Sequence, residues 1–335
     1  MIRKPEPMFE RFESMDALAP RPLLDRALAG RAFDVDQIAC ASAAQIIRKV
    51  RLPSNAANLK PRSLSKDLLL RLAVAVICHQ INWDFLWSKL ASVLDEVEHG
   101  PEFLSVVTSR DIETWLAGYH RRERIRAKER AAFLRDVGKV LLEKYSGDPR
   151  LLLSRAEGKL YGPGGVMSRL DDFAALHMDP LRKKSNVFIH EIIRDGLASF
   201  DDQEKIAPAI DYHIMRLYLR TGRVVPIHNE TFNVLKRDVV PRPRFVRLMR
   251  EAVSEALSLT ALYAGMSIPA VNGIEWEIGR DICGRAKPKC NEPVDRKHVL
   301  ILHDGCGCPY ASFCRAYADQ AWRELREPEL KKSFY

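Results

Sequence analysis

Residues 282–314 read ICGRAKPKCNEPVDRKHVLILHDGCGCPYASFC and hold five of the seven cysteines in the chain. Four of these cysteines form two spaced pairs, Cys283-x6-Cys290 and Cys308-x5-Cys314. Clustered thiols in a chain without a secretory leader indicate a metal site rather than disulfides. Four thiolates supplied from short loops can surround a [4Fe–4S] cluster, which is the interpretation that this spacing favours.

Two other interpretations of the same cysteines stay open. A tetrahedral zinc site also takes four thiolates, although zinc knuckles usually place about two to four residues between paired ligands. The six-residue spacer is therefore unusual for zinc. Bare structural thiols are the third interpretation. Cys306 could replace Cys308 as a ligand or remain free, and the isolated Cys40 and Cys78 are expected in the core.

Length, composition and charge limit the class of protein. A chain of 335 residues suits one large domain or two closely packed ones, and 47% apolar with 29% charged residues is ordinary for a globular protein. We see no apolar run near the roughly 18 residues of a membrane span, and the N-terminus lacks a secretory signal. We therefore expect an intracellular, cytoplasmic protein. The net charge of +9 favours nucleic acid as a partner.

Helical periodicity dominates from about residue 65 to 260, so the sequence predicts an all-α fold. Asp179 is a candidate N-cap for a helix over 181–197, with Pro180 in its first turn. Only HVLIL, at 298–302, is typical of a strand. The main expected helical stretches are 65–97, 109–119, 121–145, 168–177, 181–197, 212–221 and 243–263.

The cysteine loop resembles that of endonuclease-III-like and MutY-like helix-hairpin-helix DNA glycosylases, whose pattern is Cys-x6-Cys-x2-Cys-x5-Cys. Pro288 and Pro309 match the prolines often found in that loop. Here, however, 17 residues separate Cys290 from Cys308, which indicates an insertion over 291–307. The resemblance implies a [4Fe–4S] cofactor, DNA as partner and nucleoid association, and we expect a monomer. It also implies a two-lobed fold with an N-terminal extension (1–64) on the cluster lobe, a six-helix-type domain (65–225) and a cluster domain (226–335).

A second resemblance lies at IDYHIMR (210–216), followed by RTG (220–222), which is similar to the family segment that carries the catalytic aspartate. Breaking an N-glycosidic bond leaves positive charge on the sugar, which an ionised carboxylate can stabilise, or the carboxylate can activate water. The resemblance makes Asp211 the first candidate catalytic residue. Its alternative role is the N-cap of the helix over 212–221, and both roles can hold together.

The segment RKKSNV (182–187) resembles the start of the family's second hairpin helix. Lys183 falls on the lysine that, in bifunctional members, attacks the sugar as an amine and gives strand cleavage (AP-lyase activity). Such a lysine must be deprotonated, which needs a cationic or apolar setting. The alternative is an ordinary surface lysine at a helix start. Arg182 and Lys184 are candidate DNA-binding residues beside it.

Two further segments bear on DNA binding. VICHQINW (76–83) resembles the family helix end at which a glutamine fills the hole left by an extruded base. Gln80 takes that place, and His79, Asn82 and Trp83 are candidate base contacts. In contrast, HMDPL (177–181) replaces the family hairpin glycines with an acid and a proline, which removes amide donors for a phosphate.

Three functions follow from these motifs. The leading hypothesis is a base-excision DNA N-glycosylase. The second is a hydrolase that releases a modified base from a free nucleoside or nucleotide, because several segments are similar to queuosine salvage hydrolases, which also lack the glycine hairpin. The third is a non-catalytic nucleic-acid-binding protein. A basic stretch is either a phosphate contact or a solvated helix face, and its cations are Arg121, Arg122, Arg124, Arg126, Lys128 and Arg130.

Overall fold

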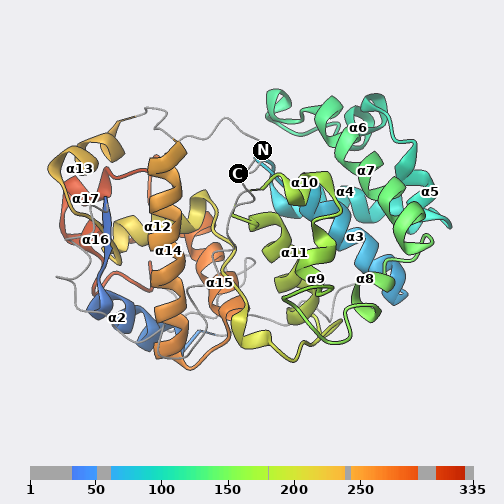
Figure 1. Ribbon diagram of the computed structural model, residues 1–335. Coiled ribbons are helices and arrows are strands. Elements are labelled where there is room, and N and C mark those ends of the chain that lie inside the picture. The colour runs from blue at the N-terminus through green and yellow to red at the C-terminus, as the bar shows by residue number, and fades with distance from the viewer. Residues whose placement is uncertain (1–31, 51–61, 180, 238–242, 293–306, 329–335) are drawn as a thin grey trace. The chain divides into compact units, whose positions relative to one another are not determined.

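The computed structural model describes residues 32–50, 62–179, 181–237, 243–292 and 307–328. These residues are mainly helical with one two-stranded sheet, which confirms the all-α class (Figure 1). They divide into unit 1 (62–206) and unit 2 (32–50 and 207–328). The division falls after Ile206 rather than at the expected 225, so Asp211 belongs to unit 2 together with Cys283, Cys290, Cys308 and Cys314. Pro180, Cys306 and the strand expected at 298–302 lie outside the described residues.

Unit 1 is built around α3, whose residues Leu68–Ile77 are all buried. A helix that is apolar on every side must be surrounded, and α4, α5, α7, α10 and α11 pack against it. Ser63 caps its first turn. The helices are α3 (Leu64–Ile77), α4 (Trp83–Asp95), α5 (Gly100–Ser105), α6 (Ser109–Trp115), α7 (Ala127–Tyr145), α8 (Leu151–Ser154), α9 (Val166–Leu170), α10 (Ala174–His177) and α11 (Lys183–Arg194), with 3-10 turns η4 (Arg122–Arg124) and η5 (Gln203–Lys205).

Two stretches of continuous helical periodicity are interrupted in unit 1. The stretch 65–97 breaks between α3 and α4, where Gln80 has a φ of 54°. The expected helix over 121–145 begins only at Ala127, because Arg126 before it has a φ of 44°. Left-handed backbone at a non-glycine residue is uncommon, and nothing in an apolar pattern signals it.

Unit 2 is built around the long helix α14, which packs on β1, α2, α12 and α15 (Figure 1). The strands are antiparallel, with Phe33 opposite Pro226, so part of the expected N-terminal extension belongs to this unit. The helices expected over 212–221 and 243–263 are confirmed as α12 and α14. The elements are β1 (Phe33–Val35), α2 (Gln37–Ile47), α12 (Tyr212–Thr221), β2 (Val224–Pro226), α13 (Asn229–Lys236), α14 (Pro243–Ala264), α15 (Ile268–Glu277), the π-helical turn η6 (Ile278–Ile282), α16 (Arg315–Ala318) and α17 (Gln320–Arg323).

In the described part of the chain, no single helix is both long and apolar enough to cross a membrane. Residues 244–264 and 268–282 meet the length and hydropathy requirement only as a pair bent by 111°.

Candidate functional site

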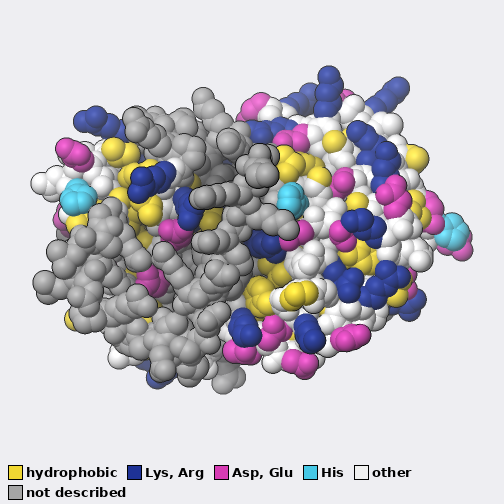
Figure 2. All heavy atoms as spheres, viewed as in Figure 1, with side chains coloured by type: hydrophobic (Ala, Val, Ile, Leu, Met, Phe, Trp, Pro, Cys, Tyr) yellow, Lys and Arg dark blue, Asp and Glu magenta, His cyan; other side chains and the backbone are white. Residues whose placement is uncertain are grey.

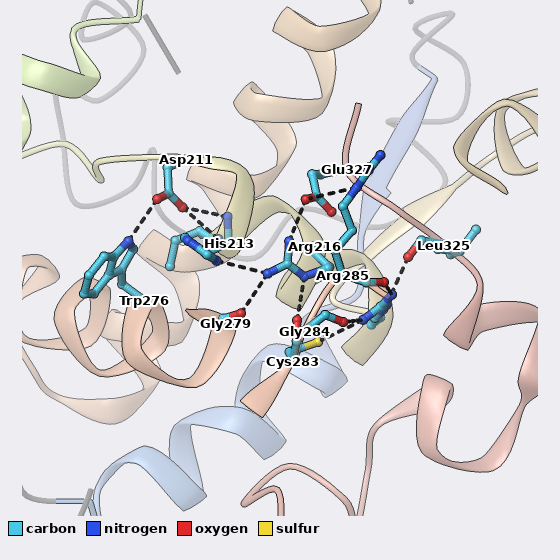
Figure 3. Close-up of polar contacts among 12 residues, drawn as sticks. Asp211, His213, Arg216, Trp276, Gly279, Cys283, Gly284, Arg285, Leu325 and Glu327 are labelled. Carbon is cyan, nitrogen blue, oxygen red and sulfur yellow. Dashed lines mark hydrogen bonds and ion pairs between the residues drawn. The ribbon is translucent and has the colours of Figure 1, made fainter. Parts of the chain in front are cut away.

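Asp211 caps the start of α12. Its Oδ1 accepts hydrogen bonds from the backbone N–H of His213 at 2.8 Å and of Ile214 at 3.0 Å, so the predicted N-cap is confirmed. Its Oδ2 accepts a hydrogen bond from Trp276 Nε1 at 2.9 Å (Figure 3). Asp211 is only 5% exposed. Three donors therefore fix the direction of this carboxylate. Each carboxylate oxygen can accept about two hydrogen bonds, so these donors do not use every acceptor position.

Trp276, in α15, is a neighbour of Asp211 that was not among the residues expected at the site. Its ring lies edge-on to His213, with centroids 6.0 Å apart, and the Arg280 guanidinium lies 4.3 Å from the ring centre. A cation over an indole face and a carboxylate at its N–H together hold the ring in place. The only sequence signal for it is a tryptophan inside the helical stretch that leads into the first cysteine.

Arg216 connects α12 to the loop of Cys283. Its Nε donates to Cys283 O at 2.5 Å, and its Nη2 donates to Gly279 O at 2.9 Å and lies 3.0 Å from His213 Nδ1 (Figure 3). Burial lowers the pKa of His213 to about 4, so near pH 7 the neutral ring can accept that bond. A Cβ on Gly279 would lie 2.7 Å from His213 O, so this close approach requires glycine.

Arg220 lies four residues after Arg216, on the same face of α12. It is buried, and its Nη1 lies 3.7 Å from Cys283 Sγ and donates to Gly284 O at 2.7 Å. Its Nη2 donates to Arg285 O at 2.8 Å. N–H donors to a ligand sulfur tune iron–sulfur clusters, and Arg220 is placed to be such a donor. The two arginines thus tie the first cysteine to the helix that begins at Asp211.

The two ends of the insertion meet at the cysteines that flank it. Cys308 N donates to Cys290 O at 2.8 Å. Gly307 has a φ of 79°, and a Cβ there would lie 2.4 Å from Cys290 O, so only glycine fits this closure. Residues 293–306 lie outside the described part. The long spacing in sequence is therefore compatible with two neighbouring cysteines in space.

The four candidate ligands Cys283, Cys290, Cys308 and Cys314 influence one another electrostatically. Burial raises the pKa of Cys290 and Cys308 and raises that of Cys314 to about 11, and nearby thiols raise each of them further. A metal must displace these protons, because thiolates are the ligands. The donor set suits an iron–sulfur cluster. Within the described residues, no three His, Cys, Asp or Glu side chains are grouped so as to hold a single metal ion.

Lys184 and Arg130 lie in the interior of unit 1, at the C-terminal end of α3. Lys184 Nζ donates to Val76 O at 2.7 Å, and Arg130 donates to Ile77 O at 3.2 Å and to His79 O at 2.6 Å. Both cations satisfy helix-end carbonyls and oppose the negative end of the helix dipole. Burial lowers the pKa of Lys184 to about 8. Neither ammonium nor guanidinium is available to DNA phosphates in this conformation, in contrast to the sequence prediction.

His79 is completely buried, so the expected base contact is also absent in this conformation. Its Nε2 lies 3.4 Å from Glu129 Oε2, yet neither ring nitrogen has a hydrogen-bond partner among the described residues. Burial lowers the pKa of His79 to about 3, far below its ordinary value. The ring is therefore neutral near pH 7.

We predict that His79 makes unit 1 sensitive to acid. The unfolded chain binds a proton at this ring below a pH of about 6.5, whereas the folded chain does so only near pH 3. Stability should therefore fall with decreasing pH by about 1.4 kcal/mol per unit in this window. Between pH 6.5 and pH 5, the free energy of unfolding in urea should fall by about 2 kcal/mol less in His79→Gln than in the wild type. The same substitution at the exposed His120 is the control, and an equal effect there would contradict the prediction.

Lys183 is the first residue of α11, with 7% of it exposed. Its Nζ lies 3.7 Å from the thiol of Cys78. Its positive charge is one of the causes that lower the pKa of Lys184, so the two ammonium groups lie within electrostatic range of each other. Lys183 belongs to unit 1, whereas Asp211 belongs to unit 2.

The turn before α11 carries a carboxylate where the resembled family has glycines. Asp179 is 2% exposed, and its Oδ2 accepts from Lys184 N at 3.0 Å while its Oδ1 accepts from Leu181 N at 3.2 Å. Arg182, with a φ of 51°, takes the N-cap position and forms an ion pair with Asp171 at 2.5 Å. Asp179 therefore supplies the capping acceptor, although α11 begins at Lys183 rather than 181. The Asp179 carboxylate therefore accepts hydrogen bonds from backbone N–H groups that a phosphate at this helix start would otherwise use.

The remaining candidates, Gln80, Asn82 and Trp83, lie where α3 ends and α4 begins. Asn82 is exposed and caps α4 through Phe85 N at 2.8 Å. Trp83 is half-buried and stacks on Trp87, with ring centroids 6.2 Å apart. Gln80 has left-handed backbone, which is common where function constrains the chain. The positions of Asn82 and Trp83 are compatible with a structural role and with contact to a base.

The basic stretch presents fewer cations than its sequence suggests. Arg121, Arg122 and Lys128 are exposed, whereas Arg130 is completely buried. Figure 2 shows Lys and Arg side chains interspersed with Asp and Glu over the visible part of unit 1. A surface of mixed sign binds polyanions less strongly than a uniformly basic one.

No protein-family model matches the chain, and no curated protein matches it significantly. The candidate site in unit 2 is therefore identified by its own residues and their contacts. The structure brings Asp211, Trp276 and the cysteine loop together in that unit, and it places the other candidate residues in unit 1.

Proposed function

We propose that the protein is an N-glycosylase that hydrolyses the bond between a sugar and a modified or damaged base, with DNA as the substrate. The scaffold would be of the helix-hairpin-helix glycosylase type. One observation carries the proposal: the carboxylate at the start of α12 and the cysteine loop are joined through Arg216 on the same helix. Two motifs that resemble one family thus meet in one site.

Asp211 would act on the sugar. Its carboxylate is oriented by the α12 amides and Trp276, which suits stabilisation of the positive charge that develops as the C1′–N bond breaks. The carboxylate can instead take a proton from the water that attacks C1′, while the base leaves with the electrons of the C1′–N bond. The base then receives that proton, directly or through solvent, which restores the carboxylate. Burial beside Trp276 strengthens either interaction by excluding water.

Cys283, Cys290, Cys308 and Cys314 would hold the [4Fe–4S] cluster, which when bound cross-links the loop into a fixed shape. Arg220 would then donate to the sulfur of Cys283 and orient it. Lys183 would add AP-lyase activity if its amine attacks C1′ in place of water. Trapping with borohydride tests that role, because Lys183→Ala should lose the trapped adduct.

The test of the proposal is base release. The protein, prepared anaerobically, would be incubated with duplexes that carry a panel of modified bases and, in parallel, with the free modified nucleosides. Release from at least one duplex supports the proposal. Release from nucleosides alone would favour the second candidate function, and release from neither would contradict both.

The second candidate is hydrolysis of a free modified nucleoside or nucleotide. It is favoured by Asp179, whose carboxylate takes the amide at the start of α11 that would otherwise face a DNA phosphate. A nucleoside has no backbone phosphate to bind there. The absence of hairpin glycines fits the same substrate.

Neutralising that carboxylate distinguishes the two substrates. Asp179→Asn keeps one acceptor oxygen but removes the negative charge, so duplex binding should tighten about fivefold if the turn approaches a phosphate. Hydrolysis of a free nucleoside should be unchanged. Asp202→Asn is the matched control, because Asp202 accepts from Leu160 N and Tyr161 N elsewhere in unit 1. Equal tightening in both variants would reflect net charge alone.

The exposed part of the basic stretch gives a further prediction. Replacing Arg121, Arg122 and Lys128 by Gln should weaken duplex binding about equally for all sequences. The slope of log Kd against log salt should flatten by about 0.9 for each phosphate that the variant no longer neutralises. Replacing Arg150, an exposed arginine elsewhere in unit 1, is the control. An unchanged slope would exclude this stretch from the DNA-binding surface.

A further inference from the structure

Tyr310 lies between Cys308 and Cys314 in the second half of the cysteine loop, and its side chain is completely buried. Its hydroxyl donates to Glu275 Oε1 at 2.8 Å. The Tyr218 hydroxyl, from α12, donates to Oε2 of the same carboxylate. One buried carboxylate of α15 therefore holds a hydroxyl from the α12 helix and another from the cysteine loop.

Arg223 completes this buried group. It forms an ion pair with Glu275, and its guanidinium carbon lies 3.7 Å from the centre of the Tyr218 ring and 5.1 Å from that of Tyr310. Its Nε donates to Thr221 Oγ1 at 3.0 Å. Glu275 and Arg223 are both fully buried, so each charge depends on the other. Interlocked buried networks of this kind specify one arrangement of the segments that they join.

The two halves of the cysteine loop are held differently. Arg216 and Arg220 hold the first half through the backbone oxygens of Cys283 and Gly284. The second half follows the 17 residues that separate Cys290 from Cys308. Its two ends are held by the bond from Cys308 N to Cys290 O and by the contact of Cys314 Sγ with Arg220 O at 3.4 Å. The side chain of Tyr310 reaches the core between the two cysteines of that half.

We propose that Glu275 positions the Cys308–Cys314 segment for cluster assembly, by accepting the hydroxyl of Tyr310. This inference rests on the proposed cluster. Glu275 acts through Tyr310 and is a positioning residue, since it reaches the thiols only through that segment. The contact gives the interior of this segment a side-chain anchor, in addition to the backbone bond at Cys308.

A matched pair of variants tests this role in the full chain. Tyr310→Phe and Tyr218→Phe each remove one hydroxyl from the same carboxylate, but only Tyr310 belongs to the cysteine loop. After anaerobic reconstitution, loss of the visible absorption to an iron chelator should be severalfold faster in Tyr310→Phe than in wild type. After one-electron chemical reduction to the paramagnetic state, the cluster signal in electron paramagnetic resonance should broaden in Tyr310→Phe. Tyr218→Phe should behave like wild type in both measurements.

The outcomes separate the positioning role from the cluster itself. Equal loss rates in the two variants, or rates equal to wild type, would overturn the positioning role and leave the cluster in place. Zinc in place of iron would overturn the cluster, and the rates of zinc release from the two variants would then decide the positioning role. A wild-type protein with neither metal on these thiols would overturn both. Circular dichroism of each variant shows that it is folded.

Discussion

Asp211→Asn should lower the rate of base release about a thousandfold while unit 2 stays folded. Asn caps helices as well as Asp does, so the bonds from His213 N and Ile214 N should survive. What disappears is the negative charge beside the sugar, an effect of about 4 kcal/mol on the transition state. The new amide would also face the indole N–H of Trp276, at a cost of about 1 kcal/mol in stability.

The control for this variant is Asp319→Asn. Asp319 caps α17 in the same unit through Ala321 N at 2.7 Å, and it is exposed. It should leave both the rate and the iron content unchanged. If Asp211→Asn retained the wild-type rate, with its fold checked by thermal unfolding, Asp211 would be only a helix cap.

Cys308→Ala should lose the cluster. Removal of one ligand should weaken metal binding by at least about a hundredfold. Loss of a residue that only hydrogen-bonds to a ligand already lowers metal affinity about ten- to a hundredfold. Because the metal stabilises only the folded state, the melting temperature should also drop. Iron and sulfide analysis of the anaerobically purified variant, together with its thermal unfolding, measures both effects.

Cys40→Ala separates the loss of a ligand from the loss of a buried thiol. Cys40 is fully buried in the core of unit 2, where its thiol donates to Ala256 O at 3.5 Å. Its truncation should cost about 1 kcal/mol in stability and leave the iron content unchanged. Wild-type iron in Cys308→Ala would point to Cys306 as the third ligand.

Local patterns predicted the parts of the structure that depend on neighbours in the chain. The Asp211 cap and the extent of α12 follow from an acid before an amphipathic run that ends at Gly222. The helix α14 follows from apolar spacing alone. The approach of Cys308 to Cys290 could be expected only from the family resemblance, because the insertion hides it in the sequence.

Tertiary contacts decided the features that the sequence did not reveal. Arg130, Lys184 and His79 are polar residues, yet all three are buried. The two cations bind carbonyl oxygens at the end of α3, and the His79 ring lies 3.4 Å from Glu129. The partnership of Trp276 with Asp211 spans α15 and α12, and no spacing within either helix encodes it. Such residues are identified by burial and partners, which a linear pattern does not contain.

We propose that unit 2 holds a [4Fe–4S] cluster on Cys283, Cys290, Cys308 and Cys314, next to the helix that starts at Asp211. Metal and acid-labile sulfide analysis of anaerobically purified protein decides whether the cluster is present. We expect about four iron atoms and about four sulfides per chain, with a broad visible absorption. Stoichiometric zinc without iron or sulfide would contradict it.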